Sequence, residues 1–258
     1  MEIFSLTQYV FGALSGSIVG FSLGLIGGGG SILAIPLMIY IVGMRNAHLA
    51  IGTSALAVAI NAYLALIPHA RAGNVRWRTA LWFTVAGALG AWLGSSLGKM
   101  VNGERLLFVF AILMLVVAGL MLLRQDPGNG VAVSSRRPNL VRVWSIGVGV
   151  GGVSGFFGIG GGFLIVPGLI AASDMSMLNA VGSSLLAVGT FGLTTAVNYA
   201  RSGLVDWPVA GVFVLGGFAG GWFGEKLAYR LGQRKKMLTY VFSAVVAVVA
   251  VYMLYTSA

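Results

Sequence analysis

Long apolar runs, separated by short polar segments, occupy this chain from end to end. A helix needs about 20 apolar residues, at a rise of about 1.5 Å each, to cross a bilayer core that is about 30 Å thick. The longer runs reach or approach that length, and each is predicted to be a transmembrane helix. They cover residues 47–68, 79–98, 106–123, 178–198, 208–224 and 237–255.

Shorter apolar segments flank two glycine clusters, and several of them are too short to span a bilayer. Residues 24–37 read GLIGGGGSILAIPL, and residues 155–168 read GFFGIGGGFLIVPG. In a helix interior, glycine costs about 1 kcal/mol relative to alanine, and proline costs about 3 kcal/mol. Paired interruptions at corresponding positions of two halves point to the binding site of a transporter.

The two halves of the chain are copies of one repeat, offset by about 130 residues. Residues 50–58 (AIGTSALAV) match 180–188 (AVGSSLLAV), and residues 69–77 (HARAGNVRW) match 199–207 (YARSGLVDW). Each half therefore holds a glycine-broken pair of short helices followed by three longer transmembrane helices. We expect an all-α polytopic membrane protein with a first repeat over 1–125, a cytoplasmic linker over 126–142 and a second repeat over 143–258.

Composition supports a membrane protein and changes the meaning of the high net charge. Charged residues make up 9% of the chain, against about 25% in soluble domains, and the mean hydropathy is +0.94. A net charge of +10 would suggest nucleic acid in a soluble protein. Here the basic residues lie in short loops beside apolar runs, as in cytoplasmic loops. We expect a lipid bilayer as partner, and no nucleic acid.

The basic loops also orient the halves. Arg71, Arg76 and Arg78 mark one loop as cytoplasmic. If each glycine-broken pair folds back as a hairpin, alternation places the linker arginines and the basic segment 226–236 inside as well. If each pair crossed the membrane once, that segment would lie outside. We therefore expect inverted repeats with both termini outside. The N-terminus, MEIFSLTQ, lacks the basic region of a signal peptide.

The glycine clusters provide the candidate substrate site. We expect new short helices to begin near Ser31 and Phe163, after the glycines. A helix N-terminus binds anions through unpaired N–H groups and the positive end of its dipole. The alternative interpretation is that the glycines serve only close helix packing. The candidate backbone donors are Gly29, Gly30, Ser31, Gly160, Gly161 and Gly162.

Polar side chains near the clusters are further candidates. Ser54, Ser183, Ser184 and Asn61 could donate hydrogen bonds to an anion, or could bond to backbone carbonyls and neighbouring helices. Arg71 and Arg201, in the repeated motif A-R-x-G-x-V-x-W, would attract or gate an anion at each entrance, or would only snorkel to the interface. A glycine ladder at residues 216, 220 and 224 fits either an intramolecular contact or the seam of a homodimer.

The chain offers little for enzyme chemistry. All six acids lie at the terminus or in loops, and the only histidines are His48 and His69. Cysteine is absent, which excludes disulfides and thiolate metal sites. No catalytic triad, carboxylate pair or metal cluster can be assembled at the usual spacing. We expect no enzyme activity, no metal and no cofactor.

In combination, the glycine clusters and the repeated AIGTSAL and HARAGNVRW motifs resemble the sulfite exporter TauE/SafE family, also called the toluene-sulfonate uptake permeases. The resemblance extends over essentially the whole chain. It implies a multi-pass carrier of small sulfur-containing anions in the inner membrane of a bacterium or archaeon. It also implies eight spans in two four-span repeats, a count that the charge argument modifies by splitting the glycine-broken regions.

The expected function follows from the motifs and the resemblance together. We expect a secondary transporter that exports a small sulfur-containing anion, such as sulfoacetate, sulfite or a related organosulfonate, by alternating access. An anion that leaves a cell with a negative interior gains about 2.3 kcal/mol per 100 mV, and so needs no intramembrane proton relay. The alternatives are an anion channel and a non-transporting membrane scaffold.

Overall fold

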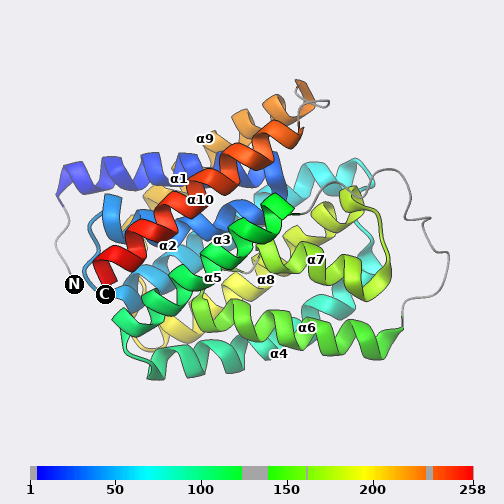
Figure 1. Cartoon of the computed structure of the whole chain (residues 1–258), viewed down its shortest axis with the longest axis horizontal. Coiled ribbons are helices and arrows are strands. Elements are labelled where there is room, and N and C mark those ends of the chain that lie inside the picture. Colours follow the sequence, from blue (N-terminus) through cyan, green and yellow to red (C-terminus); the bar gives the residue numbers. More distant parts are fainter. Residues whose placement is uncertain (1–4, 124–138, 161, 231–234, 258) are drawn as a thin grey trace.

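The computed structural model describes residues 5–123, 139–160, 162–230 and 235–257, and all regular structure in these ranges is helical. Seven of the described helices are long and apolar enough to cross a membrane. The elements, seen in Figure 1, are α1 (Leu6–Ile26), η1 (Gly27–Leu33), α2 (Ala34–Pro36), η2 (Leu37–Ile41), α3 (Ala47–Arg71), α4 (Trp77–Met100), α5 (Gly103–Leu123), α6 (Leu140–Phe157), α7 (Gly162–Ser173), α8 (Met177–Ala200), α9 (Trp207–Arg230) and α10 (Lys235–Ser257).

The first glycine cluster turns the chain through tight 3₁₀ winding. The chain passes from α1 directly into the 3₁₀ helix η1, and regular α-helix begins again at Ala34, three residues after the expected start near Ser31. Four consecutive glycines allow this tight winding because they have no side chains to eclipse at i and i+3. After Pro36 the helix widens, and the N–H of Val42 donates to the carbonyl of Leu37 at 3.0 Å.

The second glycine cluster breaks the helix. Gly158 has φ 70° and caps the end of α6, and Gly160 has φ 65°. The N–H of Ile159 donates back to the Ser154 carbonyl at 3.2 Å, which closes the last turn in a Schellman arrangement. These left-handed backbone angles suit glycine. A new helix then begins at Gly162, one residue before the expected start at Phe163.

Each glycine region reverses the direction of the chain. Gln8 of α1 donates to the Val42 carbonyl at 3.1 Å, so the start of α1 and the residue after η2 lie at one end of the bundle, here called the first end. The end of α10 also lies at this end (Figure 1). The opposite end of the bundle, here called the second end, holds the starts of α4 and α6 (Figure 1). There the ring centroids of Trp82 in α4 and Trp144 in α6 lie 6.2 Å apart. α1 and α6 therefore begin at opposite ends.

The halves interlock through two equivalent helix pairs, α1 with α9 and α6 with α4. A Cβ added at Gly16 would clash with the Phe213 carbonyl, and one added at Gly147 would lie 3.0 Å from the Phe83 carbonyl oxygen. Glycine thus permits backbone contact at both crossings, as the packing interpretation predicts. The ladder in α9 makes intramolecular contacts of this kind with α1: its members are Gly216, Gly220 and Gly224.

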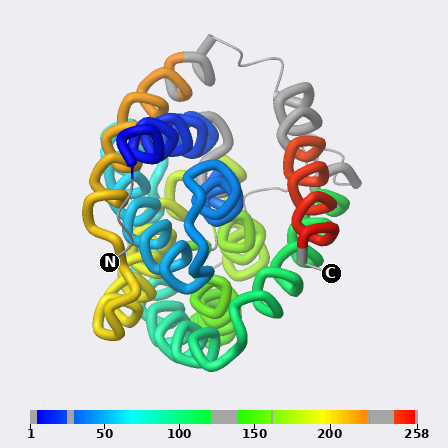
Figure 2. Tube along the Cα trace, turned by 90° about the vertical axis from the view of Figure 1, so that its left-hand side faces the viewer, coloured from blue at the N-terminus to red at the C-terminus, as the bar shows by residue number. Residues whose placement is uncertain are grey.

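The inner helices are α3 and α8. Their most apolar windows are 61% and 67% buried, against 33–50% for the other candidate spans. α5 and α10 pack on each other and form a separate pair at one side of the bundle (Figure 2). The site therefore has to be sought around α3, α8 and the two glycine regions.

Candidate functional site

The two glycine regions meet inside the bundle. Helix α7, which follows the second cluster, packs against η1 of the first. A Cβ added at Gly160 would lie 3.3 Å from Val58 of α3 and 3.2 Å from Val188 of α8, which occupy equivalent positions in the two halves. The second glycine turn thus lies between α3 of the first half and α8 of the second.

The predicted backbone donors lie in this region, in different local settings. Gly30, Ser31 and Gly162 are buried. Gly160 is in the turn before α7, and Gly29 is within the helical turns of η1, while Gly161 lies outside the described residues. Of the two glycine regions, only the second has a helix of twelve residues beginning directly after its break, at Gly162. The N-terminal N–H groups of that helix have no partners within it.

The predicted hydroxyl donors have backbone partners. Ser54 donates to the Ile51 carbonyl at 3.1 Å, and Ser184 donates to the Val181 carbonyl at 2.8 Å. Both are fully or almost fully buried. Both bonds agree with the alternative to anion binding, in which a serine hydroxyl bonds to a backbone carbonyl of its own helix.

The third hydroxyl, Ser183, takes part in a contact between the halves. It accepts a hydrogen bond from the Arg76 N–H at 2.9 Å, and Thr53 accepts an equivalent bond from the Asp206 N–H at 2.9 Å. Beside these bonds, Gly182 faces the Asn74 carbonyl and Gly52 faces the Leu204 carbonyl. The two repeated motifs therefore bind each other crosswise, with the loop of each half docked on the inner helix of the other.

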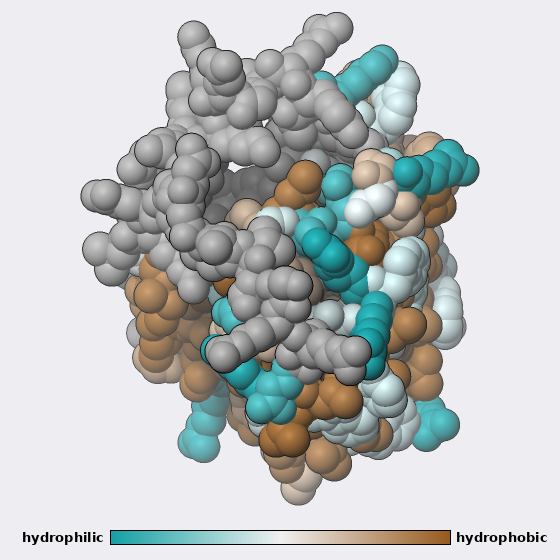
Figure 3. Space-filling model, turned by 90° about the vertical axis from the view of Figure 1, so that its right-hand side faces the viewer, coloured by the Kyte–Doolittle hydropathy of each residue, from teal (hydrophilic) through white to brown (hydrophobic). Residues whose placement is uncertain are grey.

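Arg71 and Arg201 lie at opposite ends of the bundle, and both are exposed. The Arg201 guanidinium stacks over the Trp92 ring, with its central carbon 4.9 Å from the ring centroid. Arg71 belongs to the second end, where Figure 3 shows hydrophilic side chains among apolar ones. Other exposed cations at this end are Arg76, Arg78, Arg142 and Lys226.

Asn61 is the predicted site residue with the most unusual surroundings. Its side chain is 4% exposed, and neither the amide nitrogen nor the amide oxygen has a hydrogen-bond partner. The amide packs over Gly217 of α9, whereas Phe191, its equivalent in the second half, packs its ring over Gly87 of α4. Sequence alignment of the halves could have revealed this exchange of a phenyl ring for an amide.

Several interior polar groups were not predicted. The hydroxyl of Ser154 is fully buried and has no partner in the structure. Lys99, which was not singled out either, lies at the first end of the bundle and donates to Asn198 of α8 and to Ser202, two residues after α8 ends. Among the described residues, no group of His, Asp or Glu is arranged to hold a metal ion.

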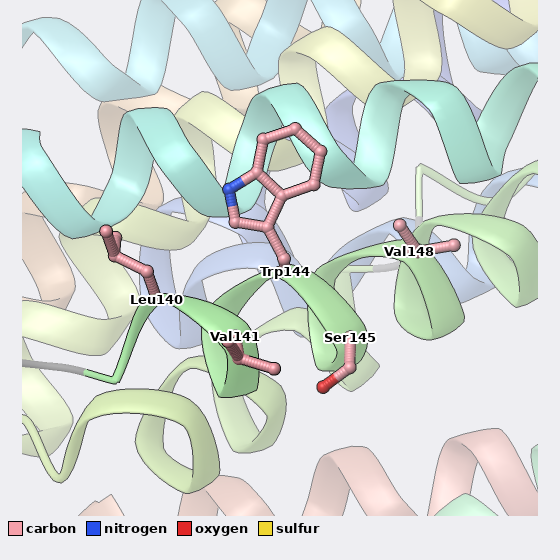
Figure 4. Close-up of a pocket in the computed structure, with 5 residues that line it drawn as sticks. All are labelled: Leu140, Val141, Trp144, Ser145 and Val148. Carbon is pink, nitrogen blue, oxygen red and sulfur yellow. The ribbon is translucent and has the colours of Figure 1, made fainter.

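A surface pocket of about 580 Å³ lies along α6 at the second end, away from these residues. It is lined by Leu140, Val141, Trp144, Ser145 and Val148, whose side chains are shown in Figure 4. The Ser145 hydroxyl donates to the Arg142 carbonyl at 3.2 Å. The pocket is almost entirely apolar and offers no cationic side chain for an anion.

Comparison with known proteins identifies the family. A probable membrane transporter protein of Xylella fastidiosa (strain Temecula1) is 52% identical over 94% of each chain. Another from Bacillus subtilis is 24% identical over 91% of this chain and 92% of its own. No solved structure gave a significant match. The family profile of the sulfite exporter TauE/SafE matches residues 12–253, and the chain therefore belongs to this family of multi-pass membrane proteins.

Proposed function

We propose that this protein is a secondary transporter that exports a small sulfur-containing anion, such as sulfoacetate, sulfite or a related organosulfonate. The observation that carries the proposal is the meeting of the two glycine regions between α3 and α8. Membership of the TauE/SafE family and the transporter names of the relatives support the same class of function.

The substrate would lie beside the second glycine turn. The N–H groups at the start of α7, which have no partners within that helix, would supply donors and the positive end of a dipole. Val58 contacts Gly160, and Asn61 follows Val58 by three residues, so its amide lies on a neighbouring part of the α3 surface. An amide can donate two hydrogen bonds and accept two. The unpartnered amide would therefore bind anion oxygens without a buried cation.

Alternating access would follow from inverted repeats. The opposite starting ends of α1 and α6, and the equivalent pairs α1–α9 and α4–α6, support that arrangement. In such a protein, rocking of one half against the other exposes a fixed central site to each side in turn. Outward movement of one negative charge is favoured by about 2.3 kcal/mol per 100 mV of membrane potential.

The test is flux through purified protein in liposomes under an imposed potential. The panel contains sulfite, sulfoacetate and methanesulfonate, with acetate as a non-sulfur control. Saturable flux with counterflow for at least one sulfur anion is the expected result. Flux without saturation or counterflow would assign an anion channel instead. Absence of flux for the whole panel, in protein that remains folded, would reject transport and favour a scaffold.

A further inference from the structure

One cation is held between the halves at the first end by neutral groups alone. The Lys99 ammonium, at the end of α4, donates to the Asn198 side-chain oxygen at 2.8 Å and to the Asn198 carbonyl at 3.0 Å. Its third bond goes to the Ser202 hydroxyl at 3.0 Å. An ammonium has three N–H donors, so all of them are used. Among the described side chains, Lys99 has no carboxylate partner.

The acceptors are rigidly oriented toward Lys99. Ser95 and Ser96 each donate their hydroxyl hydrogen to the Trp92 carbonyl, at 3.0 Å and 2.9 Å. They can therefore only accept from the Asn198 amide nitrogen, which lies 2.7 Å and 2.9 Å from their oxygens. This fixes the Asn198 oxygen on the side of the ammonium. The Tyr199 ring also faces the ammonium, with its centroid 5.8 Å away.

The sequence does not repeat the residues of this cluster in the other half. With the offset of about 130 residues, Asn198 corresponds to Pro68, Tyr199 to His69 and Lys99 to Tyr229. Proline and tyrosine supply neither the amide nor the cation. The cluster is therefore one of the features that make the two ends chemically different.

We propose that Lys99, Asn198 and Ser202 form an anion-responsive latch that closes the first end and opens when a small oxyanion binds to Lys99. This rests on the proposed function, because the ligand is the same transported anion. Neutral oxygens hold the ammonium without the Coulombic attraction that an anion adds, so an arriving anion competes with them for Lys99. A carboxylate partner would resist that exchange. In the orientation expected from the loop charges, this is the outer end.

Arg201 belongs to the same surface. It is exposed and follows Asn198 by three residues, and its guanidinium lies over the Trp92 ring. The backbone carbonyl of Trp92 accepts the hydroxyl hydrogens of Ser95 and Ser96. A second cation at this end raises the local concentration of anions around Lys99. Lys99 thereby acts on the exchange of substrate at one end, while the central site holds it.

The test measures the separation of α4 and α8 directly. Spin labels are attached to Leu97→Cys in α4 and Val197→Cys in α8, at exposed positions near the cluster. The chain has no other cysteine that could be labelled. Pulsed EPR on the full chain in nanodiscs should show a longer distance with methanesulfonate, and no change with dimethyl sulfone, its neutral analogue. Lys99→Met should show the longer distance without any anion. Ser202→Ala should respond at a roughly tenfold lower methanesulfonate concentration, because one acceptor is missing.

The matched control is Lys226→Met, which removes an exposed cation over the Trp222 ring, at the other end of the bundle. It should behave as the unsubstituted protein. An unchanged distance at methanesulfonate concentrations that support flux would overturn the latch and leave the transport proposal intact. A methanesulfonate-dependent distance in a protein that transports no member of the panel would reject transport and support the latch. If Lys99→Met does not fold, Ser202→Ala decides the outcome through the same measurement.

Discussion

At the scale of single residues, Asn61 is the position where burial and polarity conflict most. Its amide is 4% exposed and has no partner. An unpaired buried amide costs about 1–3 kcal/mol in proteins. Asn61→Leu keeps the branching at Cγ and is therefore expected to raise the free energy of unfolding by about that amount, measured by chemical unfolding in detergent. The same variant should lose anion flux if the amide binds substrate.

Asn198→Leu is the matched control, because the Asn198 amide is equally buried but fully bonded. It donates to Ser95 and Ser96 and accepts from Lys99. Its loss leaves these groups unpaired, so the unfolding free energy should fall by about 1–3 kcal/mol. Equal destabilisation by both substitutions would contradict the view that the Asn61 amide is unpaired for function.

Ser183 allows a structural role to be separated from substrate contact. Ser183→Ala removes the acceptor of the Arg76 N–H and should lower the unfolding free energy by about 0.5–1.5 kcal/mol. Ser183→Thr retains the hydroxyl, as Thr53 does at the equivalent contact, and should restore stability. Thermal unfolding and flux are measured on both variants. Flux that stays lost in a stable Ser183→Thr protein would assign Ser183 to the substrate.

At the scale of helices, the crossing of α1 and α9 depends on glycine at particular positions. A Cβ at Gly20 would clash with the Gly217 backbone, whereas one at Gly12, on the same helix, would only touch Val212 at 3.9 Å. Gly20→Ala should therefore destabilise the protein by about 1–3 kcal/mol, as overpacking does, and Gly12→Ala should be neutral or slightly stabilising. Denaturant unfolding of the two variants measures the difference.

The second half provides an internal repetition of this experiment. Gly151 contacts the Gly87 backbone at the α6–α4 crossing, and Gly149 has open space around it. Gly151→Ala should behave as Gly20→Ala does, and Gly149→Ala as the control. Tolerance of alanine at both crossing positions would mean that the backbones are farther apart than the structure places them.

The glycine regions show how far local sequence determines an element. Both clusters are rich in glycine and are followed by a proline, and both were expected to break a helix. The second does so through positive φ at Gly158 and Gly160. In the first, the chain turns within the 3₁₀ helix η1, and Gly30 packs so closely against the backbone of Ser22 and Leu23 that a Cβ there would clash. That contact is tertiary, and propensity alone does not reveal it.

At the scale of the whole molecule, the duplication and the transmembrane helices were predictable because they depend on apolar runs and repeated motifs. The site was only partly predictable. Ser54, Ser183 and Ser184 stood out as polar residues in apolar segments, but their partners are backbone groups, in the case of Ser183 on the opposite half. The Lys99 cluster was not predicted, because it joins positions about one hundred residues apart through side-chain geometry.

The direction of each half in the membrane is the last prediction, and the absence of cysteine makes it testable. Leu6 and Met100 are 81% and 82% exposed at the first end, and Met177 is 61% exposed at the second, beside the exposed Ala72. In intact cells, an impermeant thiol reagent should label Leu6→Cys and Met100→Cys. Ala72→Cys and Met177→Cys should react only after permeabilisation, because the arginine-rich loop is retained inside. Labelling of all four from one side would reject the bundle as a membrane-spanning arrangement. If Ala72→Cys and Met177→Cys reacted in intact cells and the other two only after permeabilisation, the glycine regions would still fold back as hairpins. The orientation inferred from the basic loops would then be wrong, and the Lys99 latch would lie at the cytoplasmic entrance.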